Sequence, residues 1–107
     1  MRTSSKRRQD APTWKIHPGE ILRDEFLKPL ALSEYALAKG LRVTAQRIND
    51  ITKKKSGISA EMALLLAKYF DTTPQFWMNL QTTYELTRAE KAASQKLGRI
   101  KPRKAAA

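Results

Sequence analysis

Two short helical patterns joined by a tight turn occupy residues 33–52, and this pair constrains the fold of the chain more than any other feature. Ser33 is a good N-cap for the first pattern, and Thr44 is one for the second. Ile48 and Ile51 recur at helical spacing in the second pattern, so they share one apolar face. Two such helices are typical of a helix-turn-helix, in which the second helix enters the DNA major groove.

Polar side chains occupy the outward face of the second pattern. With the two isoleucines inward and about 100° per residue, Gln46, Asp50 and Lys53 point away from the core, and Arg47 and Asn49 flank that outward face. Arg forks onto guanine, and Gln or Asn pairs with adenine. Thr and Lys suit phosphates, which position a protein without reading sequence. We therefore expect contacts to DNA from Thr44, Gln46, Arg47, Asn49, Lys53 and Lys54.

Other interpretations of this face stay open. Asp50 either accepts from cytosine N4 or pairs with Arg47 or Lys54 at helical spacing. The alternative to a DNA-binding helix pair is an ordinary helical hairpin whose polar face is exposed to solvent, because runs of charged residues are most often solvated.

The charge distribution favours DNA. The net charge is +11, of which residues 1–15 carry +4 and residues 91–107 carry +6. Residues 16–90 carry only +1, but residues 37–55 within them carry +5 and the remainder carries −4. A body polarised in this way steers and holds a polyanion, with binding that depends strongly on salt.

Several classes of function are not expected. The chain has no Cys and one His, His17, so it offers little for a metal site, and we expect no metal and no cofactor. No nucleophile–base pair or phosphate-binding glycine loop is visible, so we do not expect an enzyme. No apolar run approaches the roughly 18 residues of a membrane span, and no apolar segment follows the basic start as in a signal peptide. A reducing, cytoplasmic setting is expected.

Three further helices are expected around the pair, and no segment reads as a strand. The first opens at Pro18, runs to about Leu27 and is ended by Pro29. The expected core side chains of this helix are Ile21, Leu22, Phe26 and Leu30.

The next helix follows Ser59, and the last follows Thr73 with a proline at its first position. Four residues of the last helix give it more apolar surface than one small core needs: Phe76, Trp77, Leu80 and Tyr84. They serve the core or a self-complementary dimer interface, and we expect a homodimer through them.

The chain is thus expected to be all-α, with a domain over residues 16–90 between flexible basic tails, residues 1–15 and 91–107. A few helical turns beyond Glu90 are compatible with this composition. The run Lys6, Arg7 and Arg8 enters a minor groove as an arm or only adds non-specific affinity.

Residues 16–90 resemble the HigA family of antitoxins, a branch of the xenobiotic-response-element (Cro/C1-type) helix-turn-helix repressors. The matching segments are IHPGEILRDEFLKPL, LAKGLRV with QRINDI, GISAEMALLLAKYFDTTPQFWMNLQ, and YEL, within 75 of the 107 residues. HPGE, RIN and FWMNLQ in this order are more specific than a general helix-turn-helix match.

The resemblance implies a five-helix, lambda-repressor-like domain that forms a homodimer and binds a palindromic operator upstream of its own operon. It also implies a HigB-like toxin as partner, related to ribosome-dependent mRNA interferases. The recognition helix would span residues 44–52, and the protein would be associated with the nucleoid through its operator.

The turn departs from the family pattern. The family usually has Ala-Leu-Gly-Val there, and this chain has Gly40, Leu41, Arg42 and Val43. If the turn requires positive φ, Arg42 costs on the order of 1 kcal/mol relative to Gly. Either the turn has shifted, or the strain is tolerated because Arg42 contacts a phosphate, which adds Arg42 to the expected DNA contacts.

Three functions follow from these patterns. The first is a DNA-binding antitoxin that represses its own operon and neutralises a HigB-like mRNA interferase. The second is a stand-alone helix-turn-helix repressor without a toxin. The third is a protein- or RNA-binding adaptor on the same fold, which would not prefer a palindromic duplex to random DNA.

Overall fold

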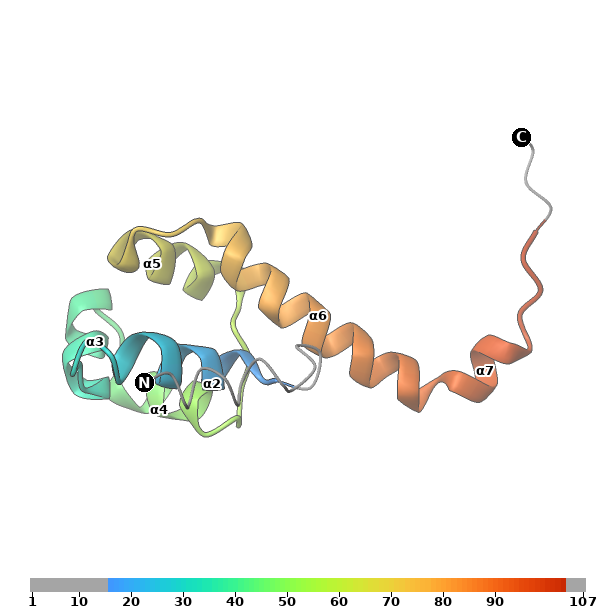
Figure 1. Ribbon diagram of the computed structural model, residues 1–107, viewed down its shortest axis with the longest axis horizontal. Helices are drawn as coiled ribbons and strands as arrows, with labels where there is room; N and C mark the ends of the chain where they lie inside the picture. The colour runs from blue at the N-terminus through green and yellow to red at the C-terminus, as the bar shows by residue number, and fades with distance from the viewer. Residues whose placement is uncertain (1–15, 104–107) are drawn as a thin grey trace.

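A computed structural model describes residues 16–103 of the chain. Within this range every regular element is a helix (Figure 1). The elements in chain order are α2 (Pro18–Ile21), η2 (Leu22–Leu27), α3 (Glu34–Leu41), α4 (Ala45–Thr52), α5 (Ala60–Phe70), α6 (Pro74–Ala92) and α7 (Ser94–Gly98). The expected all-α helix-turn-helix fold is confirmed. The basic run Lys6, Arg7 and Arg8 lies outside the described residues.

The predicted N-caps explain where four helices begin. A hydroxyl oxygen at each cap accepts a hydrogen bond from the backbone N–H three residues on, at 3.0 to 3.2 Å. This satisfies one of the N–H groups that a helix start leaves unpaired. The four capping residues are Ser33, Thr44, Ser59 and Thr73.

The first helix differs from the expectation in its winding. Its opening turn, α2, continues directly into the π-helical segment η2, where the Lys28 N–H donates to the Arg23 carbonyl at 3.0 Å. The helix ends at Leu27, and residues 28–31 form the turn that follows it. Leu27 is buried, whereas Leu30 is 60% exposed, so the prediction that Leu30 belongs to the core was wrong.

One apolar core lies between the helices. Leu22 of η2, Leu37 of α3 and Ile48 of α4 are at most 1% exposed, as are Met62 and Leu66 of α5. The expected apolar faces of the helix pair and of α5 therefore meet in one cluster.

Contacts between aromatic rings connect η2 to α5 and to α6. The ring of Phe26 lies 4.8 Å from that of Phe70 and 4.9 Å from that of Trp77, measured between centroids. Trp77 is fully buried, and its indole N–H donates to the Thr72 hydroxyl at 2.8 Å. The N-terminal turns of α6 are fixed to the body by these contacts.

Helix α6 then leaves the group formed by α2 to α5 and points away from it, with α7 at its end (Figure 1). Helical structure thus continues past residue 90, through Ala92 and again from Ser94 to Gly98. Leu86, Leu97 and Ile100 are 64%, 50% and 65% exposed. This extension buries little of its own surface against the rest of the chain.

Candidate nucleic-acid interface

The turn between α3 and α4 has the strained geometry that the sequence raised as one alternative. Arg42 follows the last residue of α3 with φ 63° and ψ 40°, a left-handed conformation. Its N–H donates to the Lys39 carbonyl at 3.2 Å, and the Val43 N–H donates to the Ala38 carbonyl at 3.0 Å. The turn has therefore not shifted, and Arg42 occupies the position that favours glycine. The side chain of Arg42 is exposed.

Helix α4 presents two distinct faces. Ile48 and Ile51 are 0% and 1% exposed and face the core. Thr44, Gln46 and Lys53 are exposed, and Arg47 and Asn49 are half-buried. The residues expected to contact DNA are thus gathered on α4 and at its two ends.

Lys54 lies just beyond α4 in a left-handed conformation, with φ 64°. Its ammonium group pairs with the Glu20 carboxylate at 2.7 Å. This ion pair joins the end of α4 to α2, and the Lys54 side chain must leave Glu20 or share it to reach a phosphate.

Carboxylates hold two of the expected base-reading side chains. The Gln46 amide donates to Asp50 Oδ1 at 2.8 Å, and Arg47 Nη2 lies 3.4 Å from Glu61 Oε1. Asp50 therefore accepts from Gln46, and the proposed pairing of Asp50 with Arg47 or Lys54 is not the arrangement found. Both Gln46 and Arg47 thus have a carboxylate partner within the chain.

Glu34 makes the third such contact and was not foreseen. Asn49 Nδ2 donates to Glu34 Oε1 at 3.0 Å, and the Thr52 hydroxyl donates to Glu34 Oε2 at 2.7 Å. The partners are 15 and 18 residues apart in sequence, so no local spacing could reveal them. Glu34 opens α3, and its carboxylate therefore links the two helices of the pair.

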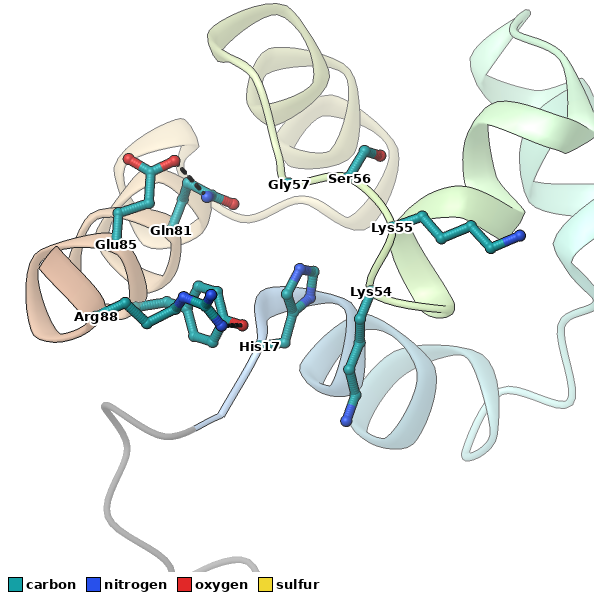
Figure 2. A pocket seen from close by; sticks show the side chains of 9 residues that line it. His17, Lys54, Lys55, Ser56, Gly57, Gln81, Glu85 and Arg88 are labelled. Carbon is teal, nitrogen blue, oxygen red and sulfur yellow. Dashed lines mark hydrogen bonds between the residues drawn. The ribbon is translucent and has the colours of Figure 1, made fainter. Parts of the chain in front are cut away.

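A polar hollow of about 330 Å³ lies beside the end of α4 (Figure 2). Gln81 of α6 spans one wall: its Oε1 accepts from the Ile58 N–H at 2.7 Å, and its Nε2 donates to Glu85 Oε2 at 2.7 Å. A Cβ on Gly57 would come within 2.5 Å of the Gln81 amide, so glycine permits this close approach. These contacts fix α6 to the loop that follows α4.

Of the lysine and arginine side chains around the hollow, Lys54 and Arg88 have partners within the chain. Lys54 pairs with Glu20, and Arg88 Nη1 donates to the Tyr84 hydroxyl at 3.0 Å. His17 accepts from the Gly19 N–H through Nδ1 at 2.8 Å, and its ring packs edge-on against Tyr84 with centroids 4.9 Å apart. Burial, followed by the nearby Lys54 charge, lowers the pKa of His17. His17 is thus a structural side chain at the start of α2.

The residues expected at a dimer interface fall into different environments. Trp77 is fully buried in the core of one protomer, so its assignment to a dimer surface is corrected. Leu80 packs partly against the same core, and Tyr84 contacts His17. Phe76 is 38% exposed. Of the four, Phe76 is the one whose side chain is exposed.

Neither a metal cluster nor a membrane span is found in residues 16–103. Within that range no group of three or more His, Cys, Asp or Glu side chains is arranged to hold a metal ion. No helix of the same range is long and apolar enough to cross a bilayer.

Residues 25–77 match the family described as "Helix-turn-helix". The chain is similar to the structure "Pseudomonas aeruginosa antitoxin HigA with higBA promoter", with 52% identity and a TM-score of 0.79 over 82% of this chain and 97% of that one. It is 31% identical to "Antitoxin HigA-1" of Vibrio cholerae over 66% of this chain and 67% of that protein. The chain belongs to the HigA family of helix-turn-helix proteins.

Other relatives of this HigA-family chain are named as a virulence-associated protein, a transcriptional regulator and an antitoxin. It is 55% identical to "Virulence-associated protein I" of Dichelobacter nodosus over 70% of this chain and 69% of that protein. It is 48% identical to "Uncharacterized HTH-type transcriptional regulator" of Haemophilus influenzae, over 78% and 80%. The structure "antitoxin GraA in complex with its operator" is 45% identical, with a TM-score of 0.79 over 84% and 92%. The family is one of DNA-binding regulators and antitoxins, not of enzymes.

Proposed function

We propose that this HigA-family protein binds operator DNA sequence-specifically, represses its own operon, and neutralises a HigB-like mRNA interferase toxin. The observation that carries the proposal is the exposed polar face of α4. It is supported by the similarity of the fold to two antitoxins whose structures contain promoter or operator DNA and whose sequences are 52% and 45% identical to this chain. A helix exposed in this way, following a tight turn, fits the major groove.

The roles of the side chains follow from their chemistry. Arg47 and Gln46 are assigned to base edges, and Asn49 joins them through the amide oxygen that Glu34 leaves accessible. Thr44 and Lys53, at the two ends of α4, are assigned to phosphates, with Lys54 and Arg42 beside them. The N-terminal end of α4 adds its own partial positive charge.

A homodimer would place two recognition helices on one palindrome. Half-sites would lie about one helical turn, ~34 Å, or a multiple of it, apart. Phe76 and the exposed side of α6 are the proposed dimer surface. Through its operator, the protein would be associated with the nucleoid.

The second candidate is a stand-alone repressor. It is supported by the relative from Haemophilus influenzae, which is named a transcriptional regulator. Co-purification with the product of a neighbouring gene for a small basic protein supports the antitoxin, whereas repression without any such partner supports the stand-alone repressor.

DNA binding is tested by a titration at physiological salt. A duplex from the region upstream of the gene is compared with a random duplex of equal length. A preference of about a thousandfold is expected, which is the lower end for specific binders. Equal, salt-sensitive binding to both duplexes would contradict the proposal.

The assignment of Arg47 is tested in the same titration. Arg47→Ala should cost about 1–3 kcal/mol of operator binding and relax one base position. Lys91→Ala is the matched control, because it also removes one positive charge but lies in the outer part of α6. Unchanged affinity and base preference in Arg47→Ala would remove Arg47 from the interface.

A further inference from the structure

A carboxylate from α3 determines how an amide of the recognition helix is oriented. Glu34 lies in the first turn of α3, and both oxygens of its carboxylate reach α4. Oε2 accepts from the hydroxyl of Thr52, which is only 3% exposed, and Oε1 accepts from Asn49 Nδ2. The buried hydroxyl fixes the carboxylate, so its second oxygen faces Asn49 in a defined place.

Chemistry then decides which end of the Asn49 amide faces Glu34. An amide carries a donating nitrogen and an accepting oxygen, whereas an ionised carboxylate only accepts. An Asn49 oxygen turned toward Glu34 would set two acceptors against each other. The nitrogen must therefore lie at Glu34, as the 3.0 Å contact shows, and Oδ1 is directed away from Glu34.

We propose that Glu34 is a specificity-positioning residue: by holding Asn49 Nδ2, it makes Oδ1 the atom that Asn49 presents to a base. This inference rests on the proposed sequence-specific DNA binding and names one determinant of that specificity. Glu34 itself need not touch the DNA.

The base preference follows from the major-groove pattern. Adenine N6 and cytosine N4 carry donating amino groups, whereas guanine O6 and thymine O4 only accept. An acceptor held outward favours adenine or cytosine on the strand that Asn49 contacts, and disfavours thymine or guanine there. A glutamine at position 34 would remove this constraint, because its amide can face either end of the Asn49 amide.

The experiment is a selection of duplexes from a randomised pool, followed by titrations of the selected site with all four bases at each position. Wild type and Glu34→Gln are compared, with Glu90→Gln as a control that removes one negative charge from an exposed position of α6. In Glu34→Gln, discrimination against guanine and thymine should fall about tenfold at one position in each half-site. The other positions should keep their preferences, and Glu90→Gln should leave all of them unchanged.

A double-mutant cycle separates this role from a general effect on folding. In an Asn49→Ala background, Glu34→Gln should not change the base preference further, because the amide it orients is gone. The inference is overturned if Glu34→Gln keeps the wild-type preference. It is also overturned if all sequences weaken equally, or if the change persists without Asn49. A wild type that selects no sequence would instead contradict the proposed function itself.

Discussion

The ring of Tyr69 in α5 lies against the backbone of Gly40 in α3. A Cβ on Gly40 would overlap Cε1 of this ring and lie 3.1 Å from Cδ1 and Cζ. Gly40 therefore has a packing role within α3: without a Cβ, it lets α5 approach the first helix of the pair. The glycine that the family usually has in the turn suits the left-handed backbone there, whereas Gly40 makes room for the Tyr69 ring.

The pair can be tested by a double-mutant cycle. In a Tyr69→Ala background, Gly40→Ala should raise the free energy of unfolding by roughly 0.5–1 kcal/mol, since alanine is the better helix former. With Tyr69 present, the gain should vanish or reverse, because the ring must swing outward. Denaturant titrations of the four proteins measure the coupling, and equal effects in both backgrounds would show that Tyr69 does not restrict position 40.

Gly19→Ala should destabilise the protein by about 3 kcal/mol, in the upper range for overpacking. A Cβ at this position would overlap the carbonyl oxygen of Ile51, which is backbone at the end of α4 and cannot rotate aside. Gly98→Ala is the control, because a Cβ there meets nothing within 4 Å. Thermal unfolding measures both, and a Gly19→Ala protein as stable as Gly98→Ala would disprove the close approach of α2 to α4.

Arg42→Gly should stabilise the fold by about 0.5–1 kcal/mol, because glycine adopts the left-handed conformation without the Cβ penalty. If Arg42 contacts a phosphate, the same change should weaken operator and random duplexes alike and lower the salt slope by about 1. Arg42→Asn separates the effects, since asparagine tolerates this conformation but carries no charge. A full salt slope in both variants would exclude the phosphate contact.

Stability should fall as the pH drops below about 6.5, because the pKa of His17 is lowered in the folded protein by burial and by Lys54. Below this pH the unfolded chain binds a proton at His17 more readily than the folded chain does. The contribution of neutral His17 to the free energy of unfolding is therefore complete above the ordinary pKa of 6.5 and is lost as the pH falls toward the lower pKa of the folded state. His17→Asn should flatten this dependence, because asparagine can still cap the helix. Denaturant midpoints between pH 5 and 7.5 measure it, and identical pH profiles for both proteins would contradict the prediction.

Local features of the fold were predictable from the sequence. Ser33, Thr44, Ser59 and Thr73 each cap a helix as expected, because a cap depends on a side chain and a backbone group only three residues away. The inward face of α4 was predictable for a similar reason, since helical periodicity is a local property.

The structural features that the sequence did not predict depend on contacts between residues far apart in the chain, or lie outside the regular helices. Glu34 meets Asn49 only after α3 and α4 have packed, and Tyr69 explains Gly40 only once α5 is in place. Leu30 lies beyond the end of η2, in the turn that follows it, so helical periodicity does not determine which way its side chain faces. Trp77 could be assigned to core or interface only when its burial was known.

The length of α6 has a geometric consequence. Its 19 residues form one uninterrupted helix, about 28 Å long at 1.5 Å per residue. The contacts that anchor it to the body run from Trp77 through Gln81 to Tyr84, and the turns after Tyr84 project beyond them. A rigid rod of this kind keeps whatever its far end carries at a set separation from the recognition helix, unlike a flexible tether, whose reach varies. Lys91, in the last turn of α6, is thus held at a set distance from α4.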